Sequence, residues 1–306
     1  AVDSKRNIWY TNWVFHQGGV LAKFNQDKFE KSSTGQFGNS TTPLFDLIDV
    51  YQFPKGMTTP NGIAAETNGK IWIADTSSSF FFSFDPKTES FTKYITSTPQ
   101  VSSYGNSSGV IKNPVSRPYW AAFNEDGKLV FNEQTANRIG VFDTESESLV
   151  EYMIPSHNPN WADCEEMENC GLAQIFDFTT SGAKIWFTEW VENNIGVLDS
   201  SIPLPIDGSA SDTSITVHRG QNATISLNIT PQEQLTYPVS IITTNTAGIQ
   251  NILIKPQDTQ VTVDKPKTVK VTISADNFSV TGTYKVLIGA RYHDVTVSKY
   301  VTVTLE

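Results

Sequence analysis

The sequence lacks several features that mark common classes of protein. Charged side chains make up 18% of the 306 residues, against an average of about 25%, and there are only four histidines and two cysteines. No apolar run approaches the roughly 20 residues of a membrane helix, so we expect no membrane span in this chain. The net charge is −10 and no Lys or Arg cluster is present to neutralise phosphates, which argues against nucleic acid as a partner.

The excess negative charge lies in one part of the chain. Residues 1–206 contain 24 acidic and 14 basic side chains, whereas residues 207–306 contain 8 of each. Two parts with such different surfaces predict two domains, residues 1–206 and residues 207–306.

A repeat runs through the first of these parts. Residues 71–75, 129–133 and 185–189 each contain three apolar residues, a small or polar residue and an acid, and residues 8–12 are a looser copy. The units that contain residues 8–12, 71–75 and 129–133 each end in a tyrosine, and the first two of these, Tyr51 and Tyr94, are 43 residues apart. Because a four-stranded propeller blade takes about 40–45 residues, the repeat predicts an all-β fold of propeller blades.

Four such blades are visible, and two of them are incomplete. In the second copy we expect strands at 62–65, 70–74, 80–84 and 90–95. The first copy begins at its second strand. In the last copy, residues 202–206 stand where the outermost strand would be, and they contain two prolines. Because proline cannot donate a hydrogen bond to a neighbouring strand, we expect no strand there. We therefore expect the C-terminal part of a larger propeller, completed by a cleaved segment or a second chain; a four-bladed ring with an unusual closure is the alternative.

The second part alternates apolar and polar residues with a period of two. Residues 213–306 contain seven or eight such short segments separated by turn residues, which is typical of an antiparallel β-sandwich of immunoglobulin or fibronectin type. Residues 279–284 resemble the Gly-Thr-Tyr start of a late strand in bacterial and archaeal surface Ig-like modules.

Cys164 and Cys170 are the only cysteines. With no further Cys or His at ligand spacing, a disulfide is favoured over a zinc site, and it indicates an extracellular, periplasmic or cell-surface location. Five Asn-X-Ser/Thr sequences, which are possible N-glycosylation sites, agree weakly with secretion: Asn39, Asn106, Asn222, Asn228 and Asn277.

Acidic and aromatic side chains recur at the ends of the repeated strands. Asp75, Glu133 and Glu189 either accept backbone N–H groups there or converge on a channel as a Ca²⁺ or Mg²⁺ site. Trp13 and Trp190 follow that position, where they either stack on a sugar or aromatic ligand or cover the core.

A further acidic segment surrounds the cysteines. It contains Asp163, Glu165, Glu166 and Glu168. The segment is either a solvated surface or, if the disulfide orders it, a binding site for a cation or a basic partner.

Two of the repeats resemble a known family. The phrases Asp-Gly-Lys-Leu-Val-Phe-Asn-Glu (residues 126–133) and Lys-Ile-Trp-Phe-Thr-Glu-Trp (residues 184–190), with the Ile-Gly-Val runs that follow, are similar to repeats of the streptogramin B (virginiamycin B) lyases. The resemblance covers about residues 5–200. It implies a seven-bladed propeller and a Mg²⁺-assisted elimination that opens a cyclic depsipeptide.

The resemblance also locates the family's catalytic positions. Its inner-strand histidines correspond to Asn61, Tyr119 and Gln174 here, and one of its metal-binding glutamates corresponds to Leu172. Among the acidic residues here, only Glu189, and less clearly Glu133, matches a metal-binding glutamate of that family. The catalytic histidines are therefore not found, and Asn, Tyr and Gln are not bases at neutral pH. We expect Tyr119 and Gln174 to contribute to ligand binding instead.

Residues 59–76 also look like a gluconolactonase-type or NHL blade, in which the Asn of Pro-Asn-Gly is a metal ligand. This resemblance implies that Asn61 binds a metal; the alternative is that it satisfies backbone groups of the inner strand.

From these observations we expect an extracellular or cell-surface binding and scaffold protein that works within a protein assembly, together with one or more protein partners. The alternative is a metal-dependent lyase or lactonase that acts on a cyclic ester at the propeller axis.

Overall fold

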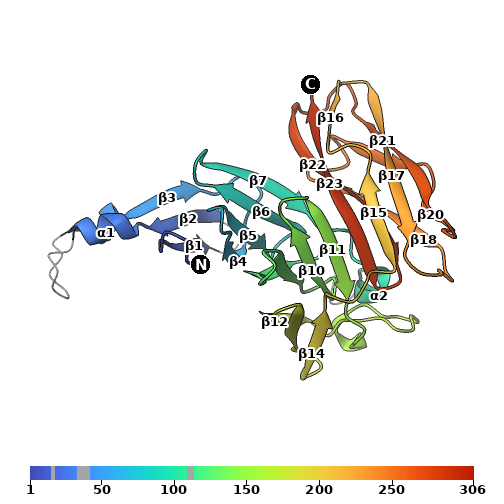
Figure 1. Cartoon of the computed structure of the whole chain (residues 1–306), viewed down its shortest axis with the longest axis horizontal. Coiled ribbons are helices and arrows are strands. Elements are labelled where there is room, and N and C mark those ends of the chain that lie inside the picture. The colour runs from blue at the N-terminus through green and yellow to red at the C-terminus, as the bar shows by residue number, and fades with distance from the viewer. Residues whose placement is uncertain (15–17, 33–41, 109–113) are drawn as a thin grey trace.

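Strands dominate the structure, a computed structural model that describes residues 1–14, 18–32, 42–108 and 114–306 (Figure 1). Four antiparallel sheets follow one another along the first 200 residues, consistent with a β-propeller-like fold, and we call them blades 1 to 4. Their strands are β1 (Ile8–Val14), β2 (Gly18–Phe24) and β3 (Ile48–Gln52) in blade 1, β4 (Pro60–Ala65), β5 (Ile71–Asp75), β6 (Phe80–Asp85) and β7 (Ser90–Ile95) in blade 2, β8 (Pro118–Phe123), β9 (Leu129–Glu133), β10 (Arg138–Asp143) and β11 (Ser148–Met153) in blade 3, and β12 (Ile175–Ser181), β13 (Lys184–Glu189) and β14 (Asn194–Asp199) in blade 4.

Blade 2 confirms the strands predicted for the second repeat. The turn between β4 and β5 contains Gly69 at a φ of +96°, a conformation that glycine adopts without steric cost, and the Lys70 N–H donates to Asn68 Oδ1 (2.9 Å). The turn therefore fixes the register of the alternating apolar residues on both sides.

Blades 1 and 4 contain three strands each in the described residues, as the repeats predicted. Blade 1 begins at β1, which corresponds to the second strand of blade 2, and a helix α1 (Gln26–Ser32) and a 3-10 turn η1 (Leu44–Leu47) separate β2 from β3. Blade 4 ends at β14. The chain then passes Pro203 and Pro205 and enters the next sheet at β15 (Ile206–Ala210).

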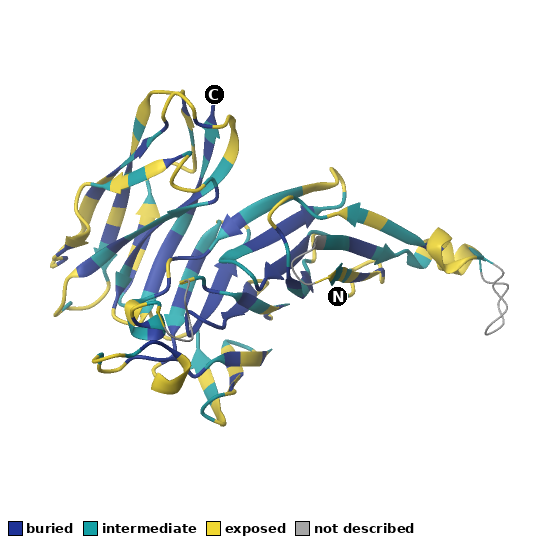
Figure 2. Cartoon of the chain, turned by 180° about the vertical axis from the view of Figure 1, so that it is seen from behind, coloured by how far each residue is buried: buried dark blue, intermediate teal, exposed yellow. Residues whose placement is uncertain are grey.

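Each blade packs against the next through apolar side chains from both. Trp9 and Leu21 of blade 1 meet Ile73 and Phe82 of blade 2 in one cluster. Two further clusters join blades 2 and 3 and blades 3 and 4. Figure 2 shows the result as buried strands through blades 2 and 3, with exposed residues alternating along blade 4.

The C-terminal residues form two sheets that share one apolar core. One sheet contains β15, β17 (Asn222–Pro231), β21 (Lys267–Ser274) and β19 (Leu253–Pro256), and the other contains β20 (Gln260–Val261), β18 (Val239–Asn245), β22 (Gly282–Tyr292) and β23 (Val295–Leu305), with β16 (Ser214–Val217) parallel to β23. No helix in the described residues is long and apolar enough to cross a membrane.

The two parts of the chain are joined by strand pairing. β23 runs antiparallel to β11, the outermost strand of blade 3, so that one nine-stranded sheet extends from β8 to β20. Tyr300 of β23 lies in the core between blades 2 and 3, and its hydroxyl donates to the Ile95 carbonyl (2.7 Å). The outer edge of blade 3 is therefore covered by a strand from the C-terminal part.

Candidate functional site

The inner strands of blades 2, 3 and 4 share one irregularity. The register shifts after the first residue of each strand, between Pro60 and Ile63, Pro118 and Ala121, and Ile175 and Phe178. A bulge of this kind redirects the side chain that follows it and is common beside functional sites. The residues that follow are Asn61, Tyr119 and Phe176.

This register corrects one of the sequence alignments. Gln174 was expected to stand in the series of Asn61 and Tyr119, but Phe176 holds that position. Gln174 precedes the strand at a φ of +53°, and its carbonyl accepts from the Trp190 N–H (3.1 Å). The error arose because the sequence phrase alone does not show that the inner strand begins at Ile175.

Three aromatic side chains meet at this end of blades 3 and 4. The ring of Phe176 lies 5.1 Å from that of Tyr119 and 5.1 Å from that of Trp190, measured between centroids. An open hollow of about 580 Å³ beside them is lined by Phe176, Thr188, Glu189, Trp190, Asn193, Asn194 and Ile195. Aromatic faces beside a carboxylate and amides suit the stacking and hydrogen bonding of a sugar or aromatic ligand.

Of the residues predicted to bind a ligand, Tyr119 and Trp190 are thus brought together through Phe176, whereas Gln174 contacts Trp190 through its backbone carbonyl. Trp13 lies in β1, where it pairs with Gly19. Ligand binding by these residues stays a prediction.

Asp75 and Asn61 are engaged by neighbouring backbone and hydroxyl groups. The Thr59 N–H donates to Asp75 Oδ1 (2.7 Å), and the Ser78 hydroxyl donates to Oδ2 (2.7 Å). Asn61 Nδ2 donates to Thr76 Oγ1 (2.7 Å), which in turn donates to the Pro118 carbonyl of the next blade (3.0 Å). Asp75 therefore accepts a backbone N–H at a strand end, the structural role considered for it, whereas Asn61 donates to a side-chain hydroxyl rather than to the backbone groups expected.

Glu133 belongs to a buried cluster of charges. Arg138 Nη2 lies 2.6 Å from Glu133 Oε2 and 3.3 Å from Glu151 Oε1, and it also donates to the Ser97 carbonyl (2.8 Å). The carboxyl groups of two glutamates share one guanidinium here. Burial raises the pKa of Glu133 to about 8, a shift that Arg138 opposes and that Glu151 increases.

Glu189 is buried beside the hollow, and Asn194 Nδ2 donates to its Oε2 (3.2 Å). Asp75, Glu133 and Glu189 therefore have separate local partners. No group of three or more His, Cys, Asp or Glu placed to hold a metal was found in the described ranges, and Ca²⁺ or Mg²⁺ binding stays a prediction.

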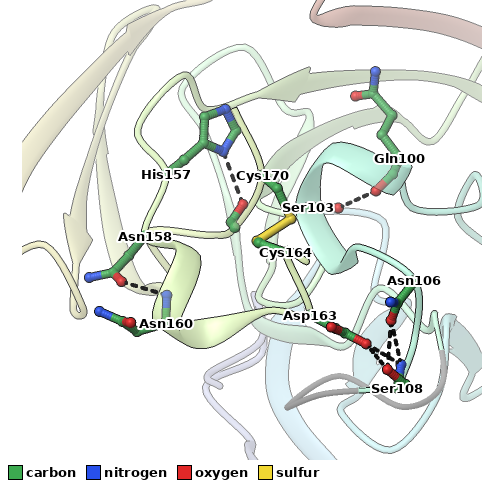
Figure 3. The surroundings of a disulfide bond; sticks show 11 residues. Gln100, Ser103, Asn106, Ser108, His157, Asn158, Asn160, Asp163, Cys164 and Cys170 are labelled. Carbon is green, nitrogen blue, oxygen red and sulfur yellow. Dashed lines mark hydrogen bonds between the residues drawn. A yellow bond between two sulfur atoms is a disulfide. The ribbon is translucent and has the colours of Figure 1, made fainter. Parts of the chain in front are cut away.

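The disulfide between Cys164 and Cys170 is present, as predicted (Figure 3). It closes a loop that follows the 3-10 turn η2 (Pro159–Trp161) and packs against the segment after α2 (Val101–Tyr104). Asp163 is buried there and accepts from the Ser108 N–H (2.7 Å) and from the Ser108 hydroxyl. Closing so short a loop contributes about 2 kcal/mol at most.

This arrangement divides the acidic segment. Asp163 holds the loop to residues 105–108, whereas Glu165, Glu166 and Glu168 are exposed. Cation or partner binding by the three glutamates stays a prediction. The described sequon asparagines, Asn106, Asn222, Asn228 and Asn277, are also exposed, whereas Asn39 lies outside the described residues.

Comparison with known proteins gives structural similarity only. No protein-family model matches the chain, and no curated protein matches it significantly. A virginiamycin B lyase from Staphylococcus aureus is 15% identical over 98% of this chain and 78% of its own, with a TM-score of 0.45. A streptogramin B lyase is 15% identical over 97% and 76%, with a TM-score of 0.42. A catalytically inactive virginiamycin B lyase from S. aureus with quinupristin is 13% identical over 97% and 92%, with a TM-score of 0.41. Similarity at this level carries no statement about activity.

Proposed function

We propose that this chain is an extracellular or cell-surface binding and scaffold protein, and that the outer face of blade 4 docks a protein partner. By the outer face we mean the side of each blade that contacts the next blade along the chain. One observation carries the proposal: positions buried on this face in blades 1 to 3 are exposed in blade 4.

The second strand supplies the first such position. Trp9, Trp72 and Val130 are 1%, 1% and 0% exposed in blades 1, 2 and 3, whereas Trp186 of blade 4 is 43% exposed. In the third strand, Val141 of blade 3 is 7% exposed and Val197 of blade 4 is 50% exposed. Apolar groups gathered on one exposed face are typical of a protein interaction site.

A polar contact follows the same pattern. Thr11 Oγ1 donates to the Pro60 carbonyl (3.0 Å), and Asn132 Nδ2 donates to the Ile175 carbonyl (2.8 Å); each acceptor begins the inner strand of the next blade. The corresponding side chain in blade 4 is Thr188, whose hydroxyl donates to Asp177 of its own blade (3.3 Å). A docked blade would offer Thr188 the carbonyl that its equivalents use.

The other parts of the proposal rest on sequence and on the disulfide. We propose that the C-terminal sheets are an Ig-like sandwich that spaces or anchors the blades, and that a larger, seven-bladed ring is completed by another polypeptide. The disulfide agrees with an oxidising compartment. The lyase or lactonase alternative gains no support from the bulged positions, because Asn61, Tyr119 and Phe176 include no base at neutral pH.

Site-specific photocrosslinking in the extracellular fraction of cells that make the protein tests the docking proposal. A photoreactive residue at Trp186 or at Val197 is expected to capture one and the same polypeptide, through an apolar strand of that polypeptide. The control position is Ile249, which is 82% exposed but lies in the C-terminal part. Equal capture at Ile249, or none at both blade positions, would refute docking at this face.

A further inference from the structure

The outer edge of blade 4 differs from the outer edges of the other blades at one particular position. In blades 1 to 3 an apolar residue of the third strand pairs with a tyrosine of the outermost strand: Leu21 with Tyr51, Phe81 with Tyr94, and Ile139 with Tyr152. These apolar residues are 0%, 2% and 0% exposed, respectively. The equivalent residue in β14 is Ile195, which is 77% exposed and has no cross-strand tyrosine in the described part of the chain.

The three outermost strands share a second feature. An apolar residue stands three positions before each tyrosine and pairs with a phenylalanine of the third strand, in the pairs Ile48 with Phe24, Phe91 with Phe84, and Leu149 with Phe142. Leu198 holds the phenylalanine's position in β14. The strand that matches this edge therefore has the pattern apolar-x-x-Tyr.

The backbone of β14 is also set to receive a strand. The Ile154 N–H donates to the Asn137 carbonyl (2.8 Å) and the Thr96 N–H donates to the Ser79 carbonyl (3.0 Å), which fixes the alternation of hydrogen-bonded pairs in blades 2 and 3. By the same alternation, the N–H and C=O groups of Ile195 and Val197 point to the open side. Unpaired edge groups of this kind are a template for strand addition.

The chain's own continuation is poorly suited to this edge. After β14 it contains Pro203 and Pro205, which cannot donate to a ladder, and it leaves for β15. Elsewhere the protein does add a strand from outside a blade, because β23 pairs with the outermost strand of blade 3. Strand addition at a blade edge is therefore already an interface of this fold.

We propose that β14 accepts an extended segment of a partner polypeptide, antiparallel and in the pattern apolar-x-x-Tyr, as the fourth strand of blade 4. The tyrosine lies opposite Ile195 and the apolar residue lies opposite Leu198. Main-chain hydrogen bonds supply affinity, and these two side chains supply the choice of segment. The inference rests on the proposal that blade 4 docks a partner.

The test uses a dye-labelled peptide with the sequence of residues 88–97, Thr-Glu-Ser-Phe-Thr-Lys-Tyr-Ile-Thr-Ser, and the intact protein. Fluorescence anisotropy is expected to show saturable binding. Replacing the peptide's tyrosine by serine, or Ile195→Ala in the protein, weakens binding by about tenfold, which is about 1.4 kcal/mol. Val197→Pro removes an outward N–H and abolishes binding, whereas Val197→Thr keeps the N–H and changes affinity by less than about threefold.

Other outcomes overturn the inference. They are no saturable binding, equal binding of the tyrosine and serine peptides, or unchanged binding to Val197→Pro; the Ile195→Ala result serves if the proline variant does not fold. Sedimentation of the protein alone tests whether a second copy of the chain occupies the edge. A dimer that Val197→Pro dissociates would assign the edge to that copy and overturn the inference.

The two proposals fail separately. Crosslinking at Trp186 without peptide binding leaves face docking in place and refutes strand addition. Peptide binding that needs the Val197 N–H, without crosslinking at either Trp186 or Val197, supports strand addition and refutes face docking.

Discussion

Blades 3 and 4 are built from the same repeat but end differently. In blade 3 the outermost strand is present, β23 covers its edge and blade 4 packs on its outer face, so that Ile139 is buried and Glu133 and Arg138 are enclosed. In blade 4 the third strand is the outermost one described, and Ile195 is exposed. The comparison teaches that a blade of this protein is complete only when another strand and another face cover it.

The largest expected effect concerns the enclosed charges of blade 3. Arg138→Met leaves Glu133 and Glu151 buried without their shared cation, so the free energy of unfolding should fall by about 3–5 kcal/mol. Urea denaturation measures it. Lys299→Met, at the half-buried rim of the same junction, should change it by less than about 0.5 kcal/mol. Similar losses in both variants would show that the cluster is not enclosed.

The same substitution at equivalent positions compares the two blades directly. Ile139→Ala should destabilise the protein by about 2–5 kcal/mol, because it leaves a cavity between blades 3 and 4. Ile195→Ala should cost less than about 0.5 kcal/mol in the protein alone. Paired urea titrations decide the matter, and equal costs would mean that the blade 4 edge is covered.

A smaller effect is expected where β23 joins the blades. Tyr300→Phe keeps the ring but leaves the Ile95 carbonyl without its donor, which should cost about 1–3 kcal/mol. Tyr237→Phe, at a tyrosine that is 59% exposed, is the control and should cost nothing measurable in the same denaturation assay. A Tyr300→Phe variant as stable as the unsubstituted protein would show that this hydrogen bond does not stabilise the junction.

The pH dependence of stability is the smallest expected effect for each pH unit of change, although it accumulates to about 5 kcal/mol over the window between the two pKa values of Glu133. Burial raises the pKa of Glu133 from its usual 4.5 to about 8, so between these values the folded protein keeps a proton that the unfolded chain has lost. The free energy of unfolding should therefore fall as pH rises through this window, by at most about 1.4 kcal/mol per unit, and Glu133→Gln should reduce the slope. Denaturation between pH 4 and 9 measures both proteins; identical slopes would contradict the assignment.

Much of this fold could be predicted from local sequence patterns, because the strands of each blade repeat a recognisable order of apolar and acidic residues. The repeat of three apolar residues followed by an acid predicted the strands of blade 2, and the prolines within residues 202–206 predicted that blade 4 stops early. Of the two roles considered for Asp75, its contacts to Thr59 and Ser78 agree with that of an acceptor at a strand end, and metal binding stays a prediction.

Long-range pairing was beyond the sequence. Nothing in residues 295–305 indicates that they add to β11, because any alternating strand offers the same edge. The buried set of Glu133, Arg138 and Glu151 was missed since its members lie on three strands and meet only through the register. Phe176 was missed because the first residue of the inner strand was misplaced; the pairing of Ile175 with Glu189 puts the equivalent position two residues after Gln174.

Amide hydrogen exchange tests the central claim, that blade 4 is open where blade 3 is closed. In the protein alone, the N–H groups of Ile139 and Val141 should exchange only through rare opening, whereas those of Ile195 and Val197 should exchange almost as fast as unprotected backbone. Slow exchange at Ile195 and Val197, equal to that at Ile139 and Val141, would contradict the account.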